Sequence, residues 1–177
     1  MKTIQSVFLL CSILLVGCAP ISTNFDYDVN WDFESLKTYQ LLTPPSDSAV
    51  NSLSRDRVRN AINSELIARG YNEVDTDPDF QVAYHVGSQD KIQVSDWGYG
   101  YGGRGSYYGY GGRRSAVDVY QYQEGSLIVD IVDTDTHKLI WRGTARKVLD
   151  TNPTPEQRTA TVNAAVAKIL EDFPPKE

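Results

Sequence analysis

The feature that most constrains the fold is a tract of 17 residues, 98–114, in the middle of the chain. It holds eight glycines, five tyrosines and three arginines, and it lacks the apolar alternation of a strand or helix. Because glycine loses more backbone entropy on ordering than any other residue, such a tract is costly to fix in one conformation. We therefore expect a flexible loop between two strands here, and a core built from the segments on either side.

The rest of the chain has the composition of one globular domain. Of its 177 residues, 41% are hydrophobic and 23% are charged, which is enough apolar material for a core. The formal net charge of −6 argues against a general nucleic-acid binder, because such proteins need basic surfaces. Two cysteines are too few for a disulfide-rich scaffold or for a zinc site made of cysteines alone. No cofactor or metal is expected.

The first 17 residues have the pattern of a lipoprotein signal peptide. Lys2 supplies a positive charge, and the apolar run over residues 7–16 is shorter than the roughly 20 residues of a membrane span. The run ends in Leu-Val-Gly-Cys, which resembles a bacterial lipobox with its cysteine at Cys18. In signals of this kind, cleavage precedes the cysteine, which then carries the lipid. The alternative is an ordinary signal peptide in which the cysteine is incidental.

The residue after Cys18 indicates a destination. Enterobacterial lipoproteins kept in the inner membrane have Asp there, so Ala19 favours the outer membrane by resemblance. Residues 18–23 would then form a lipidated tether, and acyl chains on Cys18 would hold the chain at the bilayer. We expect a domain that is lipid-anchored in the outer membrane and faces the periplasm.

The segments before the tract predict strands around one helix. Apolar residues alternate with aspartates over 25–29, which predicts a half-buried strand, and residues 37–42 predict a second. Trp31 and Phe33, between the two strands, are expected to pack on the core.

A helix is expected to begin with Ser54 as its N-cap and to end before Gly70. Residues 80–86 and 92–97 alternate as strands, with Gly87 between them predicting a bulge or a break.

The segments after the tract complete the expected fold. Residues 116–122 and 127–132 read as extended, and residues 139–148 are expected to pair with the latter run across a turn. The last helix has a capping box from Thr154 to Gln157. The order of strands, helix, strands and helix predicts an α+β domain over residues 24–175, with two helices on one face of a largely antiparallel sheet.

Few residues suggest catalysis. His85 lies in a strand, opposite the apolar face, and is expected to be a packed or surface residue rather than a general base. His137 lies in a turn with Asp133 and Asp135, where oxygen ligands could hold a cation, but aspartate is also a common turn-capping residue and we favour that role. The chain has no serine elbow and no His-Glu-x-x-His motif, so no catalytic residue is assigned.

The tract indicates recognition rather than catalysis. It contains Gly-x-Gly-x-x-Gly, but no helix follows, so a nucleotide site is not expected. Tyrosines offer stacking faces and arginines offer cation–π and bidentate contacts, so the tract is either a mobile spacer or a contact for a glycan, a lipid headgroup or an envelope protein. The residues concerned are Tyr99, Tyr101, Arg104, Tyr107, Tyr108, Tyr110, Arg113 and Arg114.

Several short motifs are similar to those of one family. They are Asp-Tyr-Asp at 26–28, Lys-Thr-Tyr at 37–39, Pro-Asp-Phe at 78–80 and Leu-Ile-Trp-Arg-Gly at 139–143. Together they resemble the bacterial lipoproteins catalogued as domain of unknown function 4136, which often carry a glycine- and aromatic-rich insert. The resemblance implies an envelope lipoprotein and brings no established activity.

The last motif also has a physical interpretation. We expect Trp141 to fill core space, Arg142 to pair with Asp130 across the hairpin, and Gly143 to mark a bulge or a close backbone approach.

The sequence therefore predicts a non-enzymatic envelope lipoprotein that binds a partner or supports the envelope. One alternative is a glycan or small-ligand binder that uses the tract. The other is a hydrolase whose carboxylates are brought together by folding.

Overall fold

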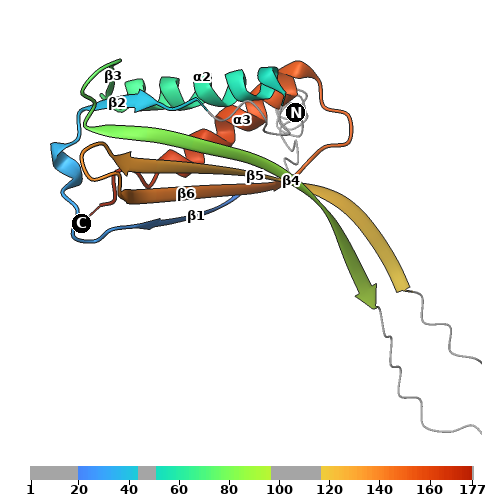
Figure 1. The fold of residues 1–177 in the computed structure, drawn as a ribbon. Coiled ribbons are helices and arrows are strands. Elements are labelled where there is room, and N and C mark those ends of the chain that lie inside the picture. Colours follow the sequence, from blue (N-terminus) through green and yellow to red (C-terminus); the bar gives the residue numbers. More distant parts are fainter. Residues whose placement is uncertain (1–19, 44–50, 97–116, 177) are drawn as a thin grey trace, which may run out of the picture.

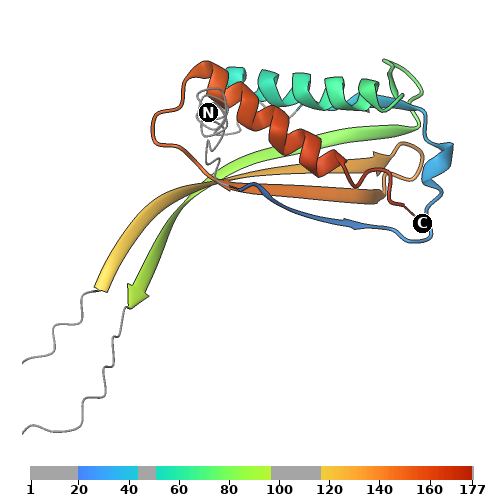
Figure 2. The same cartoon turned by 180° about the vertical axis from the view of Figure 1, so that it is seen from behind.

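The computed structural model describes residues 20–43, 51–96 and 117–176. They form a six-stranded sheet in the order β1-β6-β5-β4-β2-β3, with two helices on one face (Figures 1 and 2). The expected α+β class is confirmed. The strands are β1 (Ser22–Tyr27), β2 (Thr38–Leu41), β3 (Asn72–Glu73), β4 (Phe80–Asp96), β5 (Val117–Asp133) and β6 (Leu139–Val148).

The sheet is mixed in direction. The pairs β1–β6, β6–β5 and β5–β4 are antiparallel, whereas β4–β2 and β2–β3 are parallel. The expectation of a largely antiparallel sheet did not anticipate the parallel pairs. They arise because the helix between β2 and β3 carries the chain back across the sheet, so the next strand starts from the same end.

The first helix, α2 (Ser52–Ala68), begins earlier than its sequence suggests. Its N-cap is Asn51, whose side-chain Oδ1 accepts a hydrogen bond from the Ser54 backbone N–H at 2.9 Å. The prediction of Ser54 as N-cap is therefore wrong, because an equally good capping residue precedes it and starts the helix first. Gly70 ends the helix as predicted, in the left-handed conformation with φ of 91°.

The second helix, α3 (Pro155–Leu170), has the predicted capping box. The Gln157 backbone N–H donates to Thr154 Oγ1 at 3.3 Å, and the Thr154 N–H donates to Gln157 Oε1 at 2.8 Å. Both helices begin on the side of the domain from which β4 and β5 project (Figures 1 and 2).

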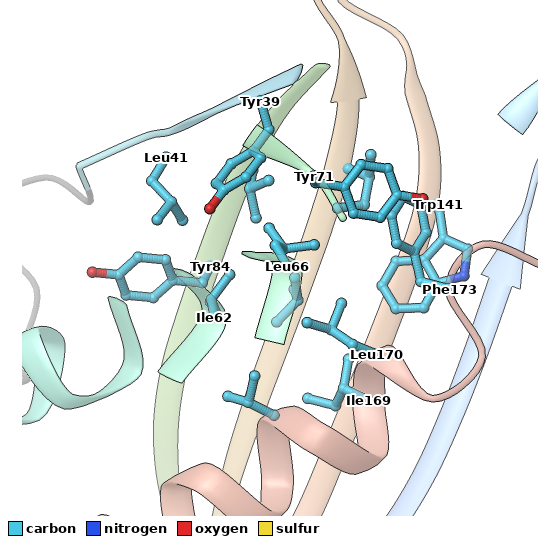
Figure 3. Packing of buried hydrophobic residues seen from close by; sticks show 14 of the residues in the cluster. Tyr39, Leu41, Ile62, Leu66, Tyr71, Tyr84, Trp141, Ile169, Leu170 and Phe173 are labelled. Carbon is cyan, nitrogen blue, oxygen red and sulfur yellow. The ribbon is translucent and has the colours of Figure 1, made fainter. Parts of the chain in front are cut away.

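The core lies between the helices and the sheet (Figure 3). Phe173, just after α3, is its centre: its ring centroid lies 5.3 Å from Trp141, 5.6 Å from Tyr71 and 5.9 Å from Phe80. Trp141 is fully buried, as expected. The buried apolar side chains of the described residues run from Leu36 to Phe173.

Among the described glycines, Gly143 is the most closely surrounded. A Cβ at this position would lie 2.3 Å from the ring of Trp141 and 2.5 Å from a methyl group of Ile169. Of the two roles expected for Gly143, the close approach is therefore the correct one. The irregularity in the β5–β6 pairing lies elsewhere, between Ile131 and Val132 of β5.

Strand β1 is more exposed than its alternating pattern predicts. Phe25 is 40% exposed, and Val29 lies beyond the strand at 77% exposed, because β1 is an edge strand. Trp31 and Phe33 pack against the core as expected, with Phe33 in a short 3-10 helix, η2 (Phe33–Ser35).

Candidate functional site: a projecting arm

Strands β4 and β5 extend beyond the rest of the sheet. They pair along all 17 residues of each strand, whereas β6 stops pairing with β5 at Glu124 and β2 pairs with β4 only near its start. The ribbon formed by residues 90–96 and 117–123, here called the arm, has no other neighbouring strand in the described part of the chain (Figure 1). At 3.3–3.4 Å per residue it is roughly 23 Å long.

The strands that form the arm are continuous, which corrects two expectations. Gly87 is neither a bulge nor a break, because β4 passes through it in regular pairing with Ser126. The two extended runs expected at 116–122 and 127–132 are one strand. Pairing with a partner strand fixes the backbone at these positions and overrides their weak local preference.

The surface of the arm combines apolar, aromatic and charged groups. Ile92 is 63% exposed and Tyr120 is 66% exposed. The rings of Tyr120 and Tyr122 stack with centroids 6.3 Å apart, and Lys91 Nζ lies 3.4 Å from Glu124 Oε1. Two-stranded ribbons are marginally stable alone, and their outer edges offer backbone donors and acceptors. The arm can therefore accept an added strand or stack against a flat ring.

The residues expected to carry recognition lie outside the described part of the chain. The eight tyrosines and arginines named above fall between Asp96, where β4 ends, and Val117, where β5 begins. Cys18, the expected lipidation site, also lies outside the described residues.

A polar cluster lies on the sheet face that the helices leave open. Arg142 holds the buried carboxylate of Asp130 through two hydrogen bonds of 2.6 and 2.7 Å, which confirms the expected cross-strand pair. The hydrogen bond to Asp130 raises the pKa of Arg142, against a smaller opposing effect of desolvation. His85 is exposed, and its Nε2 lies 3.9 Å from Asp130 Oδ2, beyond hydrogen-bond distance. Because Arg142 occupies both carboxylate oxygens, the cluster is an ion pair rather than an acid–base pair.

The β5–β6 turn uses its aspartate for capping. Asp133 Oδ2 accepts hydrogen bonds from the backbone N–H and the hydroxyl of Thr136, at 2.8 and 2.6 Å. His137 adopts φ of 55° and donates its N–H to the Asp133 carbonyl at 3.0 Å. The capping role expected for Asp133 is confirmed. Across the described residues, no three His, Cys, Asp or Glu side chains are grouped to hold a metal ion.

Asp79 joins two of the sequence motifs. Its Oδ2 accepts hydrogen bonds from the backbone N–H groups of Lys37 and Thr38, both at 2.8 Å, and from the Thr38 hydroxyl at 2.9 Å. Burial acts to raise the pKa of Asp79, but the hydrogen bonds from Thr38 and Lys37 outweigh it and hold the pKa below its usual 3.8. The two motifs therefore serve the fold, by fixing β2 at the start of β4.

Two hollows lie at opposite ends of the domain. The end hollow, about 750 Å³, is far from the arm and is lined by Tyr27, Trp31 and Phe33 together with Asn30, Asp32 and Glu34. The base cavity, about 470 Å³, lies where the arm leaves the domain, between the helices and the sheet. Its main apolar side chains are Ile21, Val86, Leu127, Leu149 and Val162.

Sequence reasoning missed both the arm and the base cavity. The arm requires two distant segments to stay paired past the end of the sheet, and no local pattern shows where neighbouring strands stop. The base cavity collects residues from three strands, from both helices and from the segments next to β1 and β6, so no spacing along the chain could have revealed it.

Comparison with known proteins adds the fold and the family. In fold, the chain is similar to a PDZ domain protein from Parabacteroides distasonis, at 11% identity and a TM-score of 0.56; the match covers 99% of this chain and 41% of that protein. The chain therefore spans about two-fifths of the length of that protein.

Weaker similarities are to a PelC dodecamer from Paraburkholderia phytofirmans and a minor lipoprotein from Acinetobacter baumannii. The PelC match has 10% identity and a TM-score of 0.44, and it covers 89% of this chain and 100% of that one. The minor lipoprotein match has 14% identity and a TM-score of 0.38, and it covers 78% of this chain and 89% of that one.

Among curated protein sequences, none matches this chain significantly. No helix within the described residues is long and apolar enough to cross a membrane. The family described as domain of unknown function (DUF4136) matches residues 22–175, and the chain belongs to this family.

Proposed function

We propose that this protein is a non-enzymatic accessory of the cell envelope, anchored in the outer membrane by lipid on Cys18, which recognises a partner through its arm and the tract beyond it. The lipobox at Cys18 supports the anchor, and membership of a family with no assigned activity is compatible with an accessory role. The partner is an envelope protein or glycan on the periplasmic side.

The arm is the observation that carries the recognition role. Ile92 and Tyr120 are 63% and 66% exposed and do not belong to the core cluster. Beyond Gln123, whose carbonyl accepts a hydrogen bond from the Leu149 N–H, the outer edges of the arm can pair with another strand. Exposed apolar and aromatic groups on a projecting ribbon are typical of contact surfaces. The arm adds little to stability and extends roughly 23 Å from the domain. Contact with a partner outside the domain is the role that accounts for both properties.

The anchor and the arm belong to the same end of the domain. Ile21 lines the base cavity together with Gly87 and Gly125, from which the arm departs. Cys18 precedes Ile21 by three residues, which span at most roughly 10 Å. The arm therefore starts close to the proposed membrane surface, where it can meet other envelope components.

An armless variant tests recognition. Asp90 and Gln123 are directly paired, so residues 91–122 can be replaced by an Asn-Gly turn that closes the ribbon at its base. After cross-linking in cells, we expect the wild-type protein to co-purify a defined partner and the armless variant to lose it. A thermal unfolding midpoint within about 2 °C of the wild type would show that the body is intact. An unchanged set of partners would contradict the proposal.

The anchor has its own test. Cells fed a fatty-acid analogue should label the wild-type protein and leave a Cys18→Ser variant unlabelled. An intact mass that retains residues 1–17, or equal label on both proteins, would contradict lipidation at Cys18.

The end hollow favours a second candidate, binding of a glycan or small ligand. Tyr27 and Phe33 meet edge to face at 6.0 Å, and Asp32 and Glu34 lie beside them. Aromatic faces next to carboxylates can stack on sugar rings and accept their hydroxyl hydrogens. Titration with cell-wall oligosaccharides should show binding that Trp31→Ala removes and the armless variant keeps. Binding lost only in the armless variant would instead assign glycan recognition to the arm and the tract.

A further inference from the structure

We propose that the base cavity binds the acyl chain of a single-chain anionic lipid, such as a fatty acid. This inference goes beyond recognition by the arm. It rests on the proposed lipid anchor only for the source of the ligand, because the anchor would place the cavity at the bilayer.

The lining of the cavity matches an alkyl chain. Its apolar side chains are all aliphatic: Val86 and Leu127 come from the sheet, Val162 and Ala165 from α3, and Ile21 and Leu149 from its edges. None of the described residues that line it is aromatic, so it lacks the flat faces that hold rings. Its volume of about 470 Å³ lies within the range of small-ligand sites.

The polar groups of the cavity match an anionic head. Lys147 is the inward-facing cation: its side chain is only 14% exposed, and it lies on the strand face that the helices cover. No carboxylate is among the described lining residues, although the chain as a whole is acidic. The other polar lining residues are Asn51, Ser54, Ser88, Ser126, Arg146 and Thr161.

The present partners of Lys147 are weak enough to exchange. Its Nζ lies 3.5 Å from both Asp150 Oδ2 and Thr161 Oγ1, at the limit of hydrogen bonding, and Asp150 is 64% exposed. A carboxylate held in the cavity would form a shorter, charge-assisted hydrogen bond with the same ammonium group. Lys147 is therefore the residue that we expect to select the head group.

The cavity also contrasts with the end hollow of the same molecule. The end hollow has three aromatic side chains, two carboxylates and Lys176, whereas the base cavity has aliphatic side chains, no carboxylate and one inward-facing cation. The two sites therefore favour different ligands. A flexible, negatively charged amphiphile fits the base cavity, and a polar ring compound fits the end hollow.

Laurate is a suitable probe, used with the domain from residue 19 to 177, which contains every described residue. Calorimetry should show one binding site. Ala165→Phe fills the cavity and should weaken laurate binding at least about tenfold, whereas Ala164→Phe, at an exposed position of the same helix, should change it less than about twofold. Val162→Phe is a second cavity-filling variant should Ala165→Phe fail to fold.

The head group is tested with Lys147→Gln and an uncharged ligand of equal chain length, monolauroyl glycerol. We expect Lys147→Gln to weaken laurate binding about tenfold and to leave monolauroyl glycerol binding unchanged. Equal effects on the two ligands would overturn the assignment of an anionic head.

Three results would overturn the cavity assignment. The first is laurate affinity unchanged in both cavity-filling variants. The second is a marked loss of thermal stability in both relative to Ala164→Phe, which would show that the chain itself fills the space. The third is laurate binding to the domain but not to lipidated protein, which would make the Cys18 acyl chain the occupant. Failure of lipidation at Cys18 would not affect the first two results, because the domain contains no Cys18.

Discussion

The same two strands behave differently in the body of the domain and in the arm. In the body, the inward side chains of β4 and β5, such as Phe80, Val82 and Val129, are completely buried. In the arm, Ile92 and Tyr120 are 63% and 66% exposed, yet the pairing register continues without interruption. Backbone hydrogen bonding therefore extends well past the point where burial stops.

The contrast separates what makes this protein fold from what it presents to its surroundings. Burial contributes roughly 25 cal/mol per Å² of apolar surface, and almost all of it lies in the body. The arm gains only cross-strand side-chain contacts, each of which contributes about 0.2–1 kcal/mol. Substitutions in the body should therefore change stability, and matched substitutions in the arm should change recognition.

Trp141→Ala should have the largest effect. The ring is fully buried against Phe173, and truncation of a buried Trp costs about 3–5 kcal/mol. Its match in the arm, Tyr120→Ala, should change stability by less than about 0.5 kcal/mol. Urea unfolding of both variants measures the difference. Equal midpoints for the two would show that the arm is as much a part of the core as Trp141.

Gly143→Ala should have the next largest effect. The added methyl group would be forced to within 2.3 Å of the Trp141 ring and 2.5 Å of Ile169, and such overpacking costs about 1–3 kcal/mol. Gly87→Ala, at the base of the arm, would meet only the Ser126 hydroxyl at 3.2 Å and should be nearly neutral. Thermal unfolding of the two variants compares the packing of the body with that at the base of the arm. A larger loss of stability in Gly87→Ala than in Gly143→Ala would show that tight packing extends to the base of the arm.

Asp79→Ala should show a smaller, pH-dependent loss. Asp79 is exposed to solvent, so its three hydrogen bonds are worth about 1 kcal/mol together after screening. Because its folded pKa is lowered below 3.8, this contribution is present at neutral pH and is lost as the pH falls through the folded value. Asp90→Ala, in the arm, should show no such loss. A constant difference between wild type and Asp79→Ala down to pH 2 would contradict the role of the carboxylate.

Local contacts made much of the body predictable. The capping box of Thr154 and Gln157 and the left-handed Gly70 depend on neighbours in the sequence, and both were predicted. The pair of Asp130 and Arg142 was also predictable, because a hairpin brings the two strands together in a simple way. The parallel pairs were not, because they depend on where a helix returns the chain.

The candidate sites were harder to predict for the same reason. The tract was visible as composition, but the paired ribbon that leads to it depends on contacts between residues almost 30 positions apart, such as Gln93 and Tyr120. The base cavity depends on how two helices leave a gap above three strands. Sequence patterns of period two or 3.6 show which face of an element is buried, but not where two elements fail to meet.

Replacement of the tract should have the smallest effect on stability. Residues 98–114 can be exchanged for a short Gly-Ser turn while the strands of the arm are kept. Loop-closure entropy changes slowly with length, by about 0.6 kcal/mol for a twofold change, so the midpoint should stay constant or rise slightly. A fall of several kcal/mol would show that the tyrosines of the tract pack as part of the fold. If the midpoint is unchanged, partner binding shows which part of the molecule carries recognition. Loss of binding in the tract-replaced variant would assign recognition to the tract. Binding that this variant keeps and the armless variant loses would assign recognition to the strands of the arm.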